Sequence, residues 1–377
     1  MSEALPGKGA GWFKRLVLPG LAFKAVVIGG GYATGREIAE FFLPAGPWGG
    51  LAALALATVI WSGVCVLTFL FARAVGAEDY RTFFKALLGR GWVVFEVAYA
   101  LFVILILAVF GAAAGEIGQA TLGLPKIAGM LALMAGIAGV AAFGNKSVER
   151  LFAWVSVLLY GVYAVFLILA LGAFGDRIAA AFSGPVEFGS GWVAGGVTYA
   201  GYNIVGAVII LPVLRHLTSS RDAVIAGLAA GPLAMLPAFL FFACMVAFAP
   251  GIGTQALPSD FLLGQLGQPA FRLLFQVMIF AALLESGTGA VHAINQRIAA
   301  AWGARRGRAL PPRTRGIIAL ALLVGCMLVA DRFGLVALIA NGYRALAYAL
   351  IAVYVLPLLT VGAYKLTQRR HLQSEVA

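Results

Sequence analysis

Long hydrophobic runs separated by short polar and basic loops make up most of the chain. A run of about 20 apolar residues is long enough to cross a bilayer as a helix. The pattern predicts ten such helices, at about 17–42, 48–72, 92–116, 124–143, 148–174, 190–214, 223–249, 269–296, 314–330 and 335–364. We therefore expect an all-α polytopic membrane protein whose surroundings are the lipid bilayer.

Composition and charge agree with this interpretation. Hydrophobic residues make up 62% of the chain and charged residues 11%, whereas soluble domains contain about 25% charged residues. The net charge of +12 does not indicate a nucleic-acid partner, because the basic residues are spread over loops and form no single patch. Placing the N-terminus in the cytoplasm puts 20 of the 27 Lys and Arg on the cytoplasmic side and 4 on the other. The positive-inside rule then predicts a cell (cytoplasmic) membrane protein with both termini cytoplasmic.

Ten helices divide into two groups of five. An odd number per group makes the second group enter the membrane from the opposite side, so an inverted repeat is possible. The expected repeats cover residues 1–174 and 175–377 of one transmembrane domain, the second including a short cytoplasmic tail.

Each group opens with a glycine-rich helix. The first reads VVIGGGYATGREIAEFF and the sixth GGVTYAGYNIVGAVIILP. Each glycine lowers helix propensity by about 1 kcal/mol relative to alanine, so breaks at mid-membrane are expected in helices 1 and 6. A break in the membrane is tolerated beside a protein-lined cavity, where freed carbonyls bind a cation and helix N-termini bind an anion. The alternative is that Gly31 and Gly35 form a GxxxG packing contact.

The paired signatures IGGGYATGREIAEFF and TYAGYNIVG resemble those of the YkvI-like membrane proteins, a branch of the amino-acid/polyamine/organocation (APC) transporter superfamily. The resemblance covers all ten predicted helices and implies a LeuT-like fold, with 5+5 inverted repeats and substrate held between the breaks. Applied to this sequence, it implies a site formed by Gly29, Gly30, Gly31, Tyr32, Ala33, Thr34, Gly35, Tyr199, Gly201, Tyr202 and Asn203. The tyrosines would cover an apolar or cationic moiety, and Asn203 would fix its orientation.

Glu285 lies inside the eighth hydrophobic run. An ionisable side chain near the bilayer centre costs about 2.5–3.5 kcal/mol, which indicates a function. We expect Glu285 to bind the coupling ion, H+ or Na+, together with Ser286 and Thr288. The two hydroxyl residues lie about 160° apart on a helix, which counts against sodium and favours a proton. The alternative is a structural ion pair with an interior arginine such as Arg344.

Arg36 follows the first glycine cluster and resembles a gating arginine of related transporters. It would face the outer vestibule, with Glu116, Asp331 or a substrate carboxylate as its partner. The alternative partner is Glu40, one turn along the same helix.

Enzyme motifs are missing from the sequence. It contains three histidines and no HExxH, GxSxG or Walker glycine loop. We expect no enzyme activity, no cofactor and no bound metal. We predict a cation-coupled secondary active transporter of a small organic solute, an amino acid or a related amine or carboxylate, that works by alternating access. The alternative is a non-transporting receptor or sensor that binds a small ligand on the same scaffold.

Overall fold

The computed structural model describes residues 11–28, 30–143 and 146–368, and within them every regular element is helical. Seven stretches of these residues are long and apolar enough to cross a membrane: Arg36–Val75, Tyr80–Leu122, Val157–Phe182, Trp192–Ile209, Ser220–Val246, Pro269–Gly303 and Arg313–Gln368. The chain is therefore a multi-pass helical membrane protein, as predicted. The count of ten spans and the 5+5 arrangement stay predictions.

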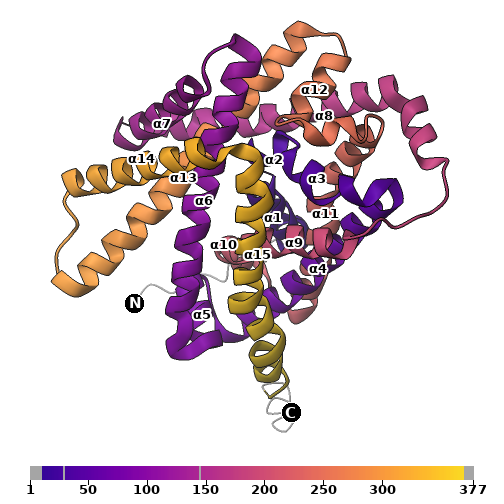
Figure 1. Ribbon diagram of the computed structural model, residues 1–377. Coiled ribbons are helices and arrows are strands. Elements are labelled where there is room, and N and C mark those ends of the chain that lie inside the picture. Colours follow the sequence, from indigo (N-terminus) through magenta and orange to yellow (C-terminus); the bar gives the residue numbers. More distant parts are fainter. Residues whose placement is uncertain (1–10, 29, 144–145, 369–377) are drawn as a thin grey trace.

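The glycine-rich first run forms three short helices, and each later run of the first half forms one long helix. The α-helices up to residue 182 are α1 (Leu18–Val27), α2 (Gly30–Ala33), α3 (Arg36–Phe41), α4 (Gly46–Val75), α5 (Tyr80–Leu88), α6 (Trp92–Leu122), α7 (Lys126–Phe143) and α8 (Lys146–Phe182). Figure 1 shows α5 at the lower end of α6. Asp79 caps α5 by accepting a hydrogen bond from the Thr82 backbone N–H at 2.9 Å.

The second half repeats this pattern of short helices followed by long ones. Its α-helices are α9 (Trp192–Asn203), α10 (Gly206–Ile209), α11 (Ser220–Val246), α12 (Pro258–Gln265), α13 (Pro269–Arg306), α14 (Pro312–Ala337) and α15 (Arg344–Leu350). α14 is kinked at Gly334 (φ 72°, ψ 168°), so α14 and α15 run in different directions in Figure 1. Two π-helical segments, Ile351–Val355 and Leu358–Gly362, continue α15 toward the C-terminus.

Small residues let α4 and α11 pack closely. A Cβ on Gly227 would lie 2.6 Å from the backbone N and Cα of Val66, so the two backbones are nearly in contact. The Ser62 hydroxyl donates to the Leu228 carbonyl at 3.0 Å across the same interface. Close approach at small residues and hydrogen bonds between helices are the usual means of packing helices in a membrane.

Trp61 joins three helices at the centre of the molecule. It is fully buried, and its indole N–H donates to the Ala200 carbonyl of α9 at 3.2 Å. Its ring lies 5.4 Å from Phe23 of α1 and 5.4 Å from Tyr199 of α9. α1, α4 and α9 are thus held in fixed positions around the glycine-rich segments.

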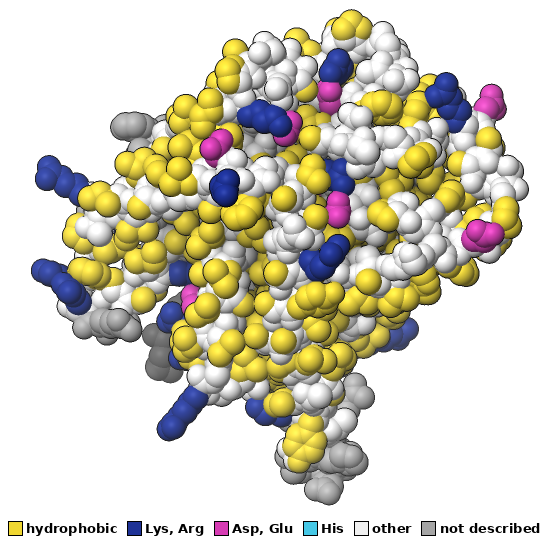
Figure 2. All heavy atoms as spheres, viewed as in Figure 1, with side chains coloured by type: hydrophobic (Ala, Val, Ile, Leu, Met, Phe, Trp, Pro, Cys, Tyr) yellow, Lys and Arg dark blue, Asp and Glu magenta, His cyan; other side chains and the backbone are white. Residues whose placement is uncertain are grey.

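The outer surface is largely apolar. Figure 2 shows hydrophobic side chains over most of the visible face, with charged groups scattered among them. Large exposed examples include Val59, Ile168 and Ile317, each on a long helix. A continuous apolar exterior is what a lipid environment requires.

Candidate functional site

The first glycine-rich segment leaves the helical conformation twice. α1 ends at Val27, and Ile28 has φ −87° and ψ 77°. α2 follows, and Gly35 then takes a left-handed conformation (φ 79°) before α3 begins at Arg36. A Cβ on Gly35 would lie 2.5 Å from the Phe241 ring. Both the φ angle and the lack of space therefore require glycine at this position.

The second glycine-rich segment is interrupted more mildly. α9 ends at Asn203, Ile204 and Val205 form a turn, and α10 begins at Gly206. Both turn residues keep right-handed helical angles. The backbone tightens to i→i−3 hydrogen bonds, from Ala207 N–H to Ile204 C=O at 3.0 Å and from Val208 N–H to Val205 C=O at 3.1 Å. The two glycine clusters thus produce different local structures.

Both segments border one central cavity of about 350 Å³, a volume typical of small-molecule sites. α1, α2, α3, α6, α9, α10, α13 and the π-helical turn before α15 all contribute to its walls. The residues that line it are Ala25, Val26, Val27, Tyr32, Glu37, Tyr99, Phe102, Val103, Ile106, Phe110, Tyr202, Asn203, Val205, Ile209, Ser286, Gly289, Ala290, Ala293 and Tyr343.

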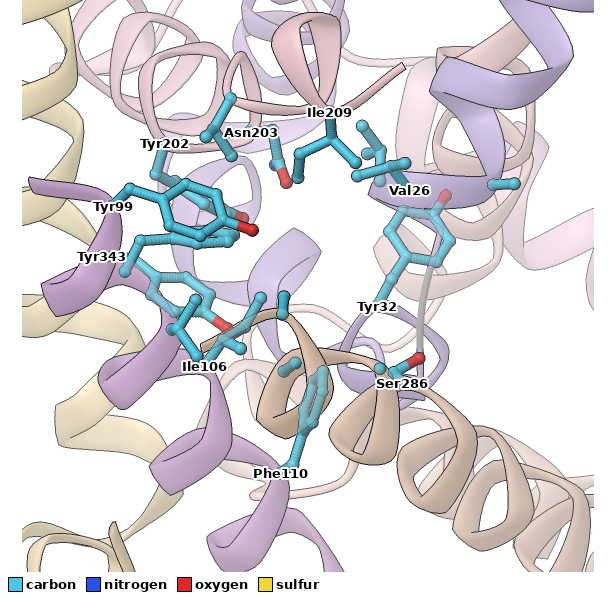
Figure 3. A pocket seen from close by; sticks show the side chains of 18 of the residues that line it. Val26, Tyr32, Tyr99, Ile106, Phe110, Tyr202, Asn203, Ile209, Ser286 and Tyr343 are labelled. Atoms are coloured by element: carbon cyan, nitrogen blue, oxygen red, sulfur yellow. The ribbon is translucent and has the colours of Figure 1, made fainter. Parts of the chain in front are cut away.

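Tyrosines dominate the polar part of the lining. Figure 3 shows Tyr99, Tyr202 and Tyr343 grouped on one side of the cavity and Tyr32 on the opposite side. The rings of Tyr202 and Tyr343 lie 4.4 Å apart between centroids. Asn203 also reaches the cavity, and its amide donates to the Tyr199 carbonyl at 3.2 Å.

Glu37 is a buried ionisable residue of the cavity wall that the sequence analysis missed. It lines the cavity from α3, and only 5% of it is exposed. The Tyr202 hydroxyl donates a hydrogen bond to its carboxylate. The rule that singled out Glu285, an ionisable side chain within an apolar run, applies equally to Glu37 and would have found it.

The structure divides the predicted binding residues into two groups. Tyr32, Tyr202 and Asn203 line the cavity. Ala33, Thr34 and Gly35, at the end of α2 and just after it, are not among the described lining residues. Gly29 and the surroundings of Gly30 and Gly31 lie outside what the structure describes.

Two other predicted binding residues face away from the cavity. Tyr199 is fully buried, with its ring 4.8 Å from Phe42 and close to Trp61. A Cβ on Gly201 would meet Ile351 and Ala347 of the C-terminal helix. These two residues pack α9 against neighbouring helices, and their role in binding stays a prediction.

Arg36 is held by a residue of its own helix and by the segment that precedes α12. Its guanidinium donates to Glu40 at 2.6 Å and to the carbonyls of Gly253 and Gln255 at 2.6 and 3.0 Å. Of the predicted partners, the structure therefore pairs Arg36 with Glu40. Glu116 instead forms an ion pair with Lys126. A gating role for Arg36 and Glu116 stays a prediction.

The Thr34 backbone is also hydrogen-bonded to the segment that contacts Arg36. The Ser259 N–H of α12 donates to the Thr34 carbonyl at 3.0 Å. Residues 253–259 are therefore attached to both Thr34 and Arg36.

The three predicted ion-coupling residues point in different directions. Ser286 lines the cavity, whereas Glu285 and Thr288 do not. The Thr288 hydroxyl donates to the Leu284 carbonyl of its own helix at 2.7 Å. Glu285 interacts electrostatically with Tyr160 of α8. The structure therefore places Ser286 with the cavity and Glu285 beside α8.

Basic residues near the site are directed elsewhere. Lys24 lies with its Nζ 4.9 Å from the centre of the Tyr160 ring. Arg344 lines a separate cavity of about 340 Å³ together with Glu40. Arg297 stacks on Tyr99, with its Cζ 3.6 Å from the ring centroid, and pairs with Glu96 at 3.1 Å.

No protein-family model matches the chain, and no curated protein matches it. Solved structures do. An inward-facing structure of Mhp1 aligns with 89% of this chain and 76% of its own, at 16% identity and a TM-score of 0.59. A structure of MhsT with L-phenylalanine aligns with 96% of this chain and 98% of its own, at 16% identity and a TM-score of 0.51. A manganese transporter mutant from Eremococcus coleocola aligns with 95% of this chain and 81% of its own, at 14% identity and a TM-score of 0.52.

The likeness extends over most of each transporter and shows a shared fold. The chain therefore has the LeuT-like transporter fold that the sequence signatures implied. Within the residues that the structure describes, no three His, Cys, Asp or Glu side chains are grouped so as to hold a metal ion.

Proposed function

We propose that this protein is a cation-coupled secondary active transporter of a small organic solute, an amino acid or a related amine or carboxylate. One observation carries the proposal: both glycine-rich segments border the same central cavity in a fold shared with transporters. A cavity between interrupted helices is the arrangement that alternating access uses, since small movements of the helix segments expose it to either side in turn.

The finer parts of the proposal concern the architecture. α1–α3 and α9–α10 would be helices 1 and 6, interrupted at mid-membrane, in a 5+5 inverted repeat with both termini cytoplasmic. The left-handed Gly35 and the turn at Ile204 and Val205 support this assignment. The paired glycine signatures support membership of the YkvI-like branch of the APC superfamily.

The structural neighbours support a compact organic solute. Mhp1, described as a nucleobase-cation-symport transporter, has a structure with bromovinylhydantoin bound, and the MhsT structure contains L-phenylalanine. The cavity of about 350 Å³ has the volume for ligands of this size.

Ion coupling is assigned to Glu285, with H+ or Na+ as the coupling ion. Glu285 is a carboxylate in the apolar helix α13, one residue before Ser286, which lines the cavity. A change in the charge of Glu285 can therefore shift the adjacent residue Ser286 and so change the shape of the cavity wall. Because Thr288 uses its hydroxyl within its own helix, the geometry favours a proton over sodium.

Transport is tested in proteoliposomes of the purified protein. A pool of labelled amino acids, amines and carboxylates is offered with an inward pH gradient, an inward sodium gradient, or no gradient and excess unlabelled solute inside. We expect one gradient to drive accumulation and counterflow to occur without a gradient. Glu285→Gln should abolish accumulation while counterflow persists, because substrate still exchanges without ion coupling.

Glu187→Gln is the matched control, because Glu187 is exposed and outside the cavity. It should transport like the unchanged protein. A ligand that binds the purified protein but never crosses the liposome membrane would contradict transport and favour a receptor or sensor. Unchanged accumulation in Glu285→Gln would remove Glu285 from the coupling step.

A further inference from the structure

The central cavity contains one carboxyl group and no basic side chain among its described lining residues. Glu37 is the single aspartate or glutamate among its described lining residues, and no lysine, arginine or histidine lines it. The remaining walls consist of tyrosines, Asn203, small residues and apolar side chains such as Phe102, Val103 and Phe110.

Within the described chain, the Glu37 carboxyl group has only part of its hydrogen-bonding capacity filled by side chains. Tyr202 donates one hydrogen bond to Oε2, and within the described chain Glu37 makes no ion pair. Arg36, the residue before Glu37, donates its hydrogen bonds to Glu40 and to the carbonyl of Gly253. A buried carboxylate with one neutral donor lacks the compensation that such groups need. A cationic ligand would supply it.

Aromatic rings surround the same carboxylate. Glu37 lies within electrostatic range of Tyr32, Tyr202 and Tyr343, and the centroids of the last two rings lie 4.4 Å apart with the ring planes tilted by 31°. Tyrosine faces attract cations, and aromatic groups with a carboxylate form a recurrent setting for ammonium ions. Figure 3 shows Tyr202 and Tyr343 on one side of the cavity and Tyr32 on the other, with the apolar side chains of Ile106 and Phe110 in the same lining.

A ligand carboxylate would find no cationic side chain in this cavity. Arg297 lies outside it, against Tyr99, and pairs with Glu96. It lines a neighbouring cavity of about 190 Å³, which shares Tyr99 and Ile209 with the central one. An ionised Glu37 would therefore repel a ligand carboxylate, and no cationic side chain of the described lining would offset that repulsion.

We infer that the central cavity selects organic amines that carry an apolar or aromatic body and no carboxylate, with Glu37 receiving the ammonium group. This inference rests on the proposed function, because it takes the cavity to be the substrate site. It assigns Glu37 to substrate recognition and leaves ion coupling to Glu285.

Three ligands with one aromatic body test the selectivity. 2-Phenylethylamine has the amine alone, L-phenylalanine has amine and carboxylate, and 3-phenylpropionate has the carboxylate alone. Binding to the purified protein in detergent is measured by calorimetry and by the rise in unfolding temperature. We expect 2-phenylethylamine to bind at least about tenfold more tightly than either of the others. Equal or tighter binding of L-phenylalanine or 3-phenylpropionate would overturn the inference.

Two substitutions of Glu37 distinguish recognition from a structural role. Glu37→Gln keeps the shape and removes the charge, and should weaken 2-phenylethylamine about ten- to hundredfold. Glu37→Asp keeps the charge one methylene farther back, and should weaken it less. A purely structural role predicts the opposite order, because glutamine is the closer fit. Glu187→Gln should leave the affinity unchanged.

The ligand comparison uses the unchanged protein, so it decides the matter even when a Glu37 variant does not fold. Stabilisation by NaCl over KCl that disappears in Glu37→Gln, with no response to the amine, would show an inorganic cation at Glu37 and refute the inference. Transport of carboxylates without amine binding would refute the inference but leave the proposed function intact. Amine binding without any transport would support the inference and contradict the proposed transport function.

Discussion

Replacing Gly35 with alanine tests the geometry of the first interrupted helix. Gly35 has φ 79°, and a Cβ there would lie 2.5 and 2.6 Å from two atoms of the Phe241 ring and 3.0 Å from the Met245 methyl group. The left-handed conformation costs a residue with a side chain about 1–2 kcal/mol. Displacing a well-packed ring costs about 1–3 kcal/mol more. Gly35→Ala should therefore lower the free energy of unfolding by about 2–5 kcal/mol.

The matched control is Gly123→Ala. Gly123 also has a positive φ, 67°, but no heavy atom lies within 4 Å of the added Cβ. It should cost only the conformational part, about 1–2 kcal/mol. Both variants are compared by unfolding in mixed micelles of dodecylmaltoside with increasing SDS, followed by tryptophan fluorescence. The difference between them isolates the contact with Phe241.

A double variant completes the test. Phe241→Leu removes the part of the ring that the new Cβ would meet, so Gly35→Ala should cost less in that background than in the unchanged protein. Equal losses in Gly35→Ala and Gly123→Ala, with no coupling to Phe241, would show that the helix does not turn at Gly35 as described.

Two further predictions concern contacts between helices. Gly227→Ala should lower the free energy of unfolding by about 1–3 kcal/mol in the same assay, because the added methyl group meets the Val66 backbone; a neutral effect would contradict the close packing of α4 and α11. Asp222→Asn should cost about 1.5–3 kcal/mol, because Asp222 accepts hydrogen bonds from Arg15 at 2.7 and 3.0 Å and from the Ser219 N–H at the start of α11. Arg15→Gln in the Asp222→Asn background should then add little, and a full additional loss would show that the two side chains act separately.

The positions of the helices followed from hydrophobicity because the bilayer requires long apolar runs. Each of the ten predicted ranges contains a helical segment of the structure. The bend at Gly334 falls between the predicted ranges 314–330 and 335–364. The conformation of the two glycine clusters did not follow. Glycine lowers the cost of many conformations, so its presence alone does not distinguish the left-handed Gly35 from the helical turn at Val205.

The candidate site was predicted in part for a similar reason. Tyr199 and Tyr202 lie three residues apart in one helix, and only Tyr202 lines the cavity, because Trp61 and Phe42 enclose Tyr199. Such neighbours come from distant parts of the sequence. Glu37 could have been singled out as an ionisable residue in an apolar run, but its place on the cavity wall could not, because Gly35 interrupts the helix and the face on which Glu37 lies cannot be extrapolated from α1.

The attachment of residues 253–259 to Thr34 and Arg36 has a consequence for any movement of the protein. Glu37 is bonded directly to Arg36, so the peptide bond between them links the carboxylate inside the cavity to residues 253–259. A displacement of residues 253–259 would therefore be transmitted to the wall of the cavity through Arg36.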